Sequence, residues 1–314
     1  MLILVVVKKV FVIVGLLLVG VTAKSQTTLI NAIQLLQQKN CVPALDICNS
    51  LLAETANDPS ILGVRSQIHT AMGKYDLALQ DADKALSIDN KSEYAHYAKA
   101  EVLYYGQKDY GQALQQYEEA IKSNAQMGEA YAGKARAYMG LQNHKSALKV
   151  IEDVVGKFPN YPELFYIRGL LNYQREKHKL AIEDYDRALS INANWNTYLI
   201  FLNRGLANGA LQNTDAAIQD LSRAIITDPN NTGGYIARGN VRYDHAKYEE
   251  AIDDFKKAVV LSPNNAVITY NIGMSYYKIG DKSSACKYFQ KSCSQGNKNA
   301  CKMVIMNCSD RNIR

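Results

Sequence analysis

Four cysteines near the end of the printed sequence offer the clearest chemistry. They are separated by 7, 8 and 7 residues and are Cys286, Cys293, Cys301 and Cys308. Four thiols can close two disulfides, bind one zinc ion or take part in thiol–disulfide exchange. Zinc sites usually contain close ligand pairs such as C-x2-C, which this spacing lacks. The spacing therefore favours disulfides, with a metal site and a redox-active pair as the alternatives.

Other residues with catalytic potential are scattered along the chain. The five histidines lie far apart, at His69, His96, His144, His178 and His245. The sequence contains no nucleophile motif, no phosphate-binding loop and no H-E-x-x-H motif. We therefore expect no enzymatic activity, no catalytic residues, no cofactor and no metal site.

The composition is that of a folded protein with balanced charge. Of the 314 residues, 47% are hydrophobic and 21% are charged, which excludes a disordered chain. Residues 26–314 contain 33 basic and 30 acidic residues. This balance argues against a nucleic-acid partner, and no basic stripe stands out.

Residues 1–25 have the pattern of a secretory signal peptide. The basic pair Lys8-Lys9 precedes an apolar run from Val10 to Val21, and small residues follow at Ala23 and Ser25. This pattern predicts cleavage between Ser25 and Gln26 and export to the periplasm or cell envelope. The alternative is an uncleaved N-terminal membrane anchor, although the run is shorter than the roughly 20 residues that usually span a bilayer. We expect no membrane span after the signal is removed.

The elements that position these residues follow a repeat. Eight alanines recur every 34 to 36 residues, at Ala44, Ala78, Ala113, Ala147, Ala181, Ala217, Ala251 and Ala285. With one extra residue in the third unit, a small residue stands twelve positions before seven of them, as in Gly169, Gly205, Gly239 and Gly273. Two small residues facing each other let two helix axes approach closely. Each unit is thus predicted to be two amphipathic helices joined by a short polar turn.

The pattern Gly239…Tyr248…Ala251…Phe255…Ala258…Pro263 resembles the tetratricopeptide repeat. The resemblance covers nearly all of residues 26–299 and implies an all-α, right-handed α-solenoid of about eight helix-turn-helix units. The units are expected at 25–58, 59–92, 93–127, 128–161, 162–197, 198–231, 232–265 and 266–299. Residues 300–314 are expected to form a capping helix and tail.

A matched set of charges predicts structural ion pairs inside four units. Counted from the first residue of each unit, position 7 is basic in six consecutive units. Position 23 of these units is Asp only where position 7 is Arg. Arg forms planar two-pronged contacts with carboxylates that Lys cannot reproduce. The predicted pairs are Arg65–Asp81, Arg168–Asp184, Arg204–Asp220 and Arg238–Asp254. The alternative, a basic track for a ligand, is less favoured.

An antiparallel hairpin of the last two helices, turning near Asn297, would bring the four cysteines level in pairs. Level residues in such a hairpin have a constant index sum, and this sum is 594 for Cys286–Cys308 and for Cys293–Cys301. An exported protein meets an oxidising compartment. We therefore predict these two disulfides, which would fasten the last helix to the array.

The resemblance also implies a binding surface, because the first helices of tetratricopeptide units line a concave groove. These positions carry many tyrosines and few charges: Tyr94, Tyr97, Glu101, Tyr104, Arg136, Tyr166, Tyr173, Asn240, Tyr243, Tyr270 and Tyr277. Tyrosine offers rigid area and a hydroxyl group, the profile of binding hot spots. The alternative is that individual rings fill the joints between units.

We therefore expect a protein–protein interaction scaffold or adaptor that binds a partner peptide or helix in a tyrosine-rich concave groove. One alternative is a thiol-redox or metal-binding protein that uses the C-terminal cysteines. Another is a self-assembling structural solenoid, in which units of neighbouring chains stack. No pattern in the sequence names the partner or the oligomeric state.

Overall fold

The computed structural model describes residues 23–308, and every regular element in this range is helical. The chain divides into two compact units, residues 1–147 and residues 148–314. Their described parts are the N-terminal unit and the C-terminal unit. Most of the expected signal peptide, residues 1–22, lies outside the described residues. Among residues 23–308, no helix combines the length and hydropathy needed to cross a membrane.

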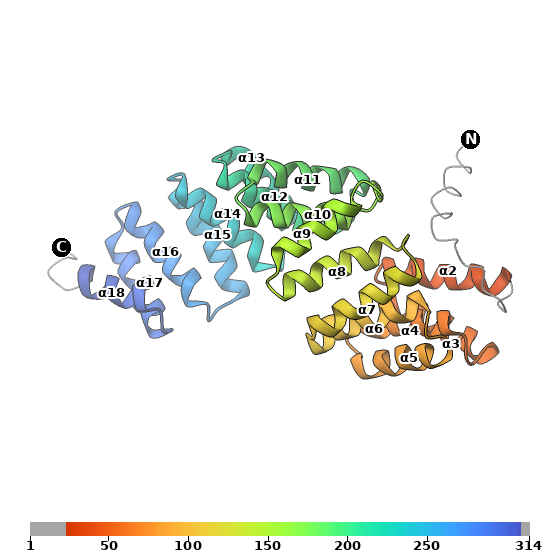
Figure 1. Ribbon diagram of the computed structural model, residues 1–314. Helices are drawn as coiled ribbons and strands as arrows, with labels where there is room; N and C mark the ends of the chain where they lie inside the picture. Colours follow the sequence, from red (N-terminus) through yellow and green to blue (C-terminus); the bar gives the residue numbers. More distant parts are fainter. Residues whose placement is uncertain (1–22, 309–314) are drawn as a thin grey trace. The chain divides into compact units, whose positions relative to one another are not determined.

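The N-terminal unit is a series of helical hairpins (Figure 1). Its helices are α2 (Ala23–Gln37), α3 (Cys41–Glu54), α4 (Pro59–Ala71), α5 (Tyr75–Ile88), α6 (Glu93–Val102), the π-helix η1 (Leu103–Gln107), α7 (Tyr110–Ser123) and α8 (Gly128–Gly140). Each helix packs on the next, and the first helices α4, α6 and α8 also pack on one another in sequence. The first helices therefore form one layer and the second helices another.

The C-terminal unit repeats this arrangement (Figure 1). Helix α9 (His144–Val154) crosses the division, and the unit continues with α10 (Pro162–Gln174), α11 (His178–Ile191), α12 (Thr197–Ala210), α13 (Thr214–Thr227), α14 (Thr232–Asp244), α15 (Tyr248–Leu261), α16 (Ala266–Lys278), α17 (Lys282–Ser294) and α18 (Lys298–Asn307). The first helices α10, α12 and α14 again pack on one another.

Close approach of the two helices in a hairpin depends on the small residues of the repeat. Ala181 is completely buried, and a Cβ atom added to Gly169 would lie 2.6 Å from the ring of Tyr185. The ring of Phe255 lies equally close to Gly239. In these two hairpins, the bulky residue four positions after the alanine thus rests directly on the backbone of the first helix.

The extra residue of the third unit is absorbed by η1. This π-helix follows α6 directly, and the backbone N–H of Asp109 donates to the carbonyl of Leu103 at 3.0 Å. Lys108 adopts a left-handed conformation with φ of 54°. A single inserted residue is commonly accommodated in this way without breaking a helix.

The last helix begins earlier than expected. Helix α18 starts at Lys298 instead of residue 300, because the side chain of Asn297 caps it by accepting hydrogen bonds from the N–H groups of Asn299 and Ala300 at 2.9 and 3.0 Å. The rest of the expected tail, residues 309–314, lies outside the described residues.

Candidate protein-binding surface

Four arginines of the first helices contact the aspartates expected from the sequence. The shortest distances from a guanidinium nitrogen to a carboxylate oxygen are 2.6 Å for Arg65–Asp81, 2.6 Å for Arg168–Asp184, 2.5 Å for Arg204–Asp220 and 2.6 Å for Arg238–Asp254. Each aspartate is buried. Each pair joins the two helices of one hairpin, so these arginines stabilise the array and are engaged within it.

A second side chain on the first helix, which the sequence pattern did not reveal, approaches the aspartate of each cluster. It stands four residues after the arginine. Asn172 and Asn208 donate to their aspartates at 2.9 and 3.2 Å, and Arg242 donates to Asp254 at 2.7 Å. In the remaining cluster, His69 Nε2 lies 3.8 Å from Asp81. Burial lowers the pKa of His69, which favours the neutral imidazole.

The two units with lysine at the same position use a different partner. Lys99 lies 2.8 Å from Asp83, and Lys134 lies 3.0 Å from Glu118, both on the preceding second helix. Arg204 also reaches back, to Asp186. Position 7 therefore links consecutive hairpins as well as the two helices of one hairpin.

The expected tyrosines of the N-terminal unit are partly used for packing. Tyr94 and Tyr97 pack against a core that contains Ala120 and Ala130. Burial raises the pKa of Tyr94 to about 12. The ring of Tyr104 lies 5.3 Å from that of Tyr110. These rings fill joints between helices, and their outer edges contribute to the surface of α6 and η1.

Glu101 and Arg136 form a network with Tyr117. The Tyr117 hydroxyl donates to Glu101 Oε1 at 2.5 Å, and Arg136 Nη2 donates to the same oxygen at 2.9 Å. The Arg136 guanidinium carbon also lies 5.3 Å from the centre of the Tyr104 ring. Three helices, α6, α7 and α8, are thereby fixed together, so both charged residues are committed to internal contacts.

The expected site residues of the C-terminal unit have similar contacts. Tyr166 accepts a hydrogen bond from Asn203 at 3.1 Å and meets the Trp195 ring at 5.7 Å. Three further tyrosines contact another ring, with centroid distances of 5.1 Å for Tyr173–His178, 5.4 Å for Tyr243–Tyr248 and 5.8 Å for Tyr270–Phe289. Two members are exposed: Tyr277, at 38%, and Asn240, whose amide oxygen faces Asn271 at 3.4 Å.

Glu129 is a half-buried carboxylate that the sequence pattern did not single out. It lies in the first turn of α8, and burial raises its pKa, opposed only by its own backbone N–H. Among residues 27–308, no other side chain donates to it or pairs with it. Its charge also contributes to raising the pKa of Tyr94 on α6, so the two groups are neighbours. A desolvated carboxylate with no cationic partner is energetically costly.

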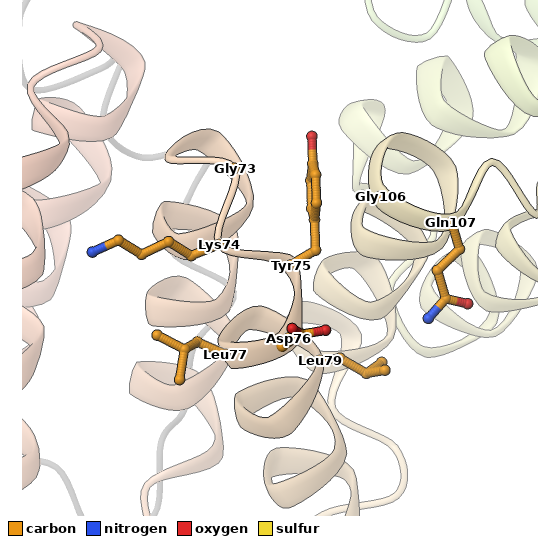
Figure 2. Close-up of a pocket in the computed structure, with 8 residues that line it drawn as sticks. All are labelled: Gly73, Lys74, Tyr75, Asp76, Leu77, Leu79, Gly106 and Gln107. Carbon is orange, nitrogen blue, oxygen red and sulfur yellow. The ribbon is translucent and has the colours of Figure 1, made fainter.

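An open depression lies where the turn between α4 and α5 meets the end of η1 (Figure 2). It has a volume of about 400 Å³. The Tyr75 ring stands against Gly106, where an added Cβ would lie 2.7 Å from the ring. Lys74 and Gln107 extend away from each other in Figure 2. Because its polar groups do not converge, the depression resembles a joint between hairpins.

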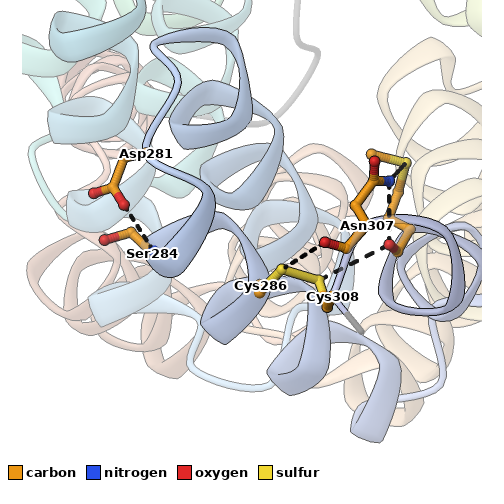
Figure 3. The surroundings of a disulfide bond; sticks show 6 residues. Asp281, Ser284, Cys286, Asn307 and Cys308 are labelled. Carbon is orange, nitrogen blue, oxygen red and sulfur yellow. Dashed lines mark hydrogen bonds between the residues drawn. A yellow bond between two sulfur atoms is a disulfide. The ribbon is translucent and has the colours of Figure 1, made fainter. Parts of the chain in front are cut away.

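The four C-terminal cysteines lie in two close pairs across α17 and α18. The sulfur atoms of Cys286 and Cys308 are 2.05 Å apart (Figure 3). Those of Cys293 and Cys301 are 1.99 Å apart. Cys41 and Cys48 are not paired. Among residues 23–308, no group of three or more histidine, cysteine or acidic side chains is arranged to hold a metal ion.

Comparison with known proteins identifies the repeats. Models described as tetratricopeptide or TPR repeats match residues 59–92, 104–171, 162–194, 239–280 and 269–295. The Hsp70-Hsp90 organizing protein of Triticum aestivum is 24% identical over 204 residues, which are 62% of this chain and 33% of that protein. DnaJ homolog subfamily C member 7 of Homo sapiens is 25% identical over 190 residues, which are 60% of this chain and 34% of that protein. The chain thus spans about a third of the length of these relatives.

Solved structures share the fold at low sequence identity. One chain of the APC/C hetero-tetramer Cut9-Hcn1 matches with a TM-score of 0.69 and 14% identity, over 89% of this chain and 55% of that chain. A tetratricopeptide repeat protein from Parabacteroides merdae matches with a TM-score of 0.53 and 18% identity, over 81% of this chain and 99% of that chain. With its helical hairpins, packed alanines and five matched segments, the chain is a tetratricopeptide-repeat protein.

Proposed function

We propose that this protein is a non-enzymatic adaptor. It binds a segment of a partner protein on the face of its first helices that points away from the second helices. The repeats support an interaction role, and the name of the wheat relative describes an organizing protein. In the N-terminal unit the proposed surface comprises Gln67 on α4, Tyr94 on α6 and Glu129 on α8. We call these residues the first-helix face.

Glu129 is the observation that carries this proposal. Burial disfavours its ionised form, and the neighbouring Tyr94 ring offers apolar area without a positive charge. A lysine or arginine of a partner would supply the missing cation, and hydrogen bonds between charged groups contribute about 1.5–3 kcal/mol. The expected ligand is therefore an extended or helical segment with apolar residues and at least one basic side chain.

A random peptide library provides a probe while the partner is unidentified. Peptides selected on the purified chain, residues 26–314, are expected to contain lysine or arginine. Their affinity is expected to fall about tenfold or more for Glu129→Gln, which removes the charge but keeps the shape.

The matched control is Glu119→Gln on α7. Its carboxylate is 48% exposed and lies 3.4 Å from Lys122, so the change is expected to leave the affinity unaltered. Glu129→Gln is also expected to leave thermal stability unchanged or slightly raised, because burial already disfavours the charge. Selected peptides without basic residues, or equal binding by both variants, would contradict the proposed face.

We also infer that the chain is exported, from the pattern of residues 1–25. N-terminal sequencing of protein purified from its native cells is expected to begin at Gln26. A chain that retains residues 1–25 in a membrane fraction would indicate the anchor instead.

A further inference from the structure

The balanced overall charge conceals a strong concentration of lysines at one end of the chain. Residues 26–265 contain 25 basic and 28 acidic residues. Residues 266–308 contain six lysines and a single acidic residue, Asp281. The lysines are Lys278, Lys282, Lys287, Lys291, Lys298 and Lys302. The last three helices, α16 to α18, are therefore strongly basic.

All six lysines are exposed. Within residues 27–308, none of them forms an ion pair. The carboxylate of Asp281 instead caps α17, accepting a hydrogen bond from the Ser284 N–H at 2.9 Å (Figure 3). The positive charges are therefore available to a partner.

The lysines of α17 and α18 lie on the solvent sides of these helices. Lys287 and Lys291 are one turn apart on α17, whereas Phe289 is fully buried. On α18 the residues Lys298, Lys302 and Ile305 have the spacing of a single helical stripe. They lie opposite Ala300, the one residue of α18 that is buried.

Two large apolar side chains stand beside these lysines. Ile305 is 78% exposed and Met306 is 68% exposed. Basic residues with protruding apolar side chains are the composition of segments that lie in the interface of a membrane. We call Lys298, Lys302, Ile305 and Met306 the cap stripe.

We propose that the cap stripe and the other exposed lysines of α16 and α17 dock on an anionic lipid surface. The lysines attract the acidic headgroups, and Ile305 and Met306 enter the interface between headgroups and acyl chains. All six cations are lysines, which act as compact point charges instead of the planar fork with which arginine recognises a specific group. They are spread over three helices, which suits a diffuse negative surface. A nucleic acid would engage the lysines but leave Ile305 and Met306 in water.

Co-sedimentation with lipid vesicles tests this proposal. The chain from residue 26 is expected to bind vesicles of phosphatidylcholine and phosphatidylglycerol, to bind pure phosphatidylcholine much more weakly, and to dissociate as salt is raised. Combining Lys298→Gln with Lys302→Gln is expected to lower the partition coefficient about thirtyfold, from about 1 kcal/mol per lysine near the surface. Combining Ile305→Ser with Met306→Ser is expected to lower it about tenfold or more.

A matched control lies on α9, where Lys145 and Lys149 are also exposed and one turn apart. Changing both to Gln is expected to alter the partition coefficient less than twofold. Because every substituted side chain is exposed, unchanged circular dichroism is expected for all three variants. Equal binding by the cap-stripe variants and the wild type would overturn the proposal. So would failure to bind the anionic vesicles together with tight binding to single-stranded DNA or polyglutamate.

Discussion

Reduction of the two cysteine pairs is expected to release α18 from the array. This helix has ten residues, and Ala300 is the one residue in it that is buried. Ile305 and Met306 face solvent. An isolated helix of this length is marginal in water. We therefore expect the attachment of α18 to depend mainly on the two cysteine pairs that join it to α17.

The expected change in the free energy of α18 release follows from the lengths of the chain loops that the two predicted disulfides close. Cys286 and Cys308 are separated by 22 residues, and Cys293 and Cys301 by 8. The chain-entropy description assigns about 3 kcal/mol to closing the longer loop. The shorter loop lies inside the longer one, so the two contributions do not simply add. About 3 kcal/mol corresponds to a hundredfold change in the fraction of chains with α18 released.

Hydrogen–deuterium exchange with and without a reductant measures this release. Amides of residues 298–307 are expected to exchange about a hundredfold faster after reduction, while those of α10 to α15 remain unchanged. When protein purified from native cells is unfolded without a reductant, thiol titration is expected to give two free thiols, from Cys41 and Cys48. Replacing Cys41 with Ser provides a control, which should leave the exchange of α18 unaffected.

Unchanged protection of residues 298–307 after complete reduction would show this expectation to be wrong. It would mean that the non-covalent contacts between α17 and α18 are sufficient to hold the cap. Finding all six thiols free in protein from native cells would instead overturn the predicted disulfides.

Three other substitutions test the interior of the array. Burial lowers the pKa of His69, beside Asp81, from an ordinary value of 6.5, so the unfolded chain binds more protons than the folded chain as pH falls below 6.5. The contribution of His69 to the free energy of unfolding is therefore present above pH 6.5 and is lost as pH falls. In urea denaturation at pH 7 and pH 5, His69→Asn should reduce this loss of stability. At an exposed helix position Gly→Ala is normally stabilising, but Gly169→Ala is expected to destabilise the protein by about 1–3 kcal/mol, because the new Cβ would lie 2.6 Å from the Tyr185 ring. A midpoint of thermal unfolding equal to or above that of the wild type would contradict this contact. Asp220→Ala is expected to lower the free energy of unfolding by about 3–5 kcal/mol, because it removes the buried carboxylate that pairs with Arg204. A loss below about 1 kcal/mol in urea denaturation would mean that this ion pair contributes little to stability.

The helical hairpins and the Arg–Asp clusters could be predicted because repetition multiplies a weak signal. One alanine or one arginine indicates little, but the same residue at the same position of several units specifies which face is packed. The link between Arg168 and Asp184 follows from this logic. The index sum that matched Cys286 with Cys308 likewise used the geometry of a hairpin, and the structure places these residues together.

Features without repetition could not be predicted in the same way. The second side chain near each aspartate is His69, Asn172, Asn208 or Arg242, so its common place is hidden by different residue types. Whether a tyrosine such as Tyr104 fills a joint depends on neighbouring rings, which the repeat pattern does not specify.

Single charged features were missed for a related reason. Glu129 stands at position 2 of its unit, where the preceding unit has Tyr94 and the next has Glu163, and its importance arises from burial. The lysines of residues 266–308 disappear in the average over the chain. The sequence contained this concentration, and counting charge by segment would have found it.

Site-specific photo-crosslinking is the direct test of the proposed first-helix face. Gln67 on α4 is half-buried on this face, and Gln80 is exposed on the second helix α5. Each is replaced, in separate variants, by a photoreactive benzoylphenylalanine and irradiated with a peptide selected on the wild-type chain. Binding on the first-helix face predicts a crosslink from position 67 and none from position 80. A crosslink from position 80 alone would place binding on the second helices and contradict the proposal.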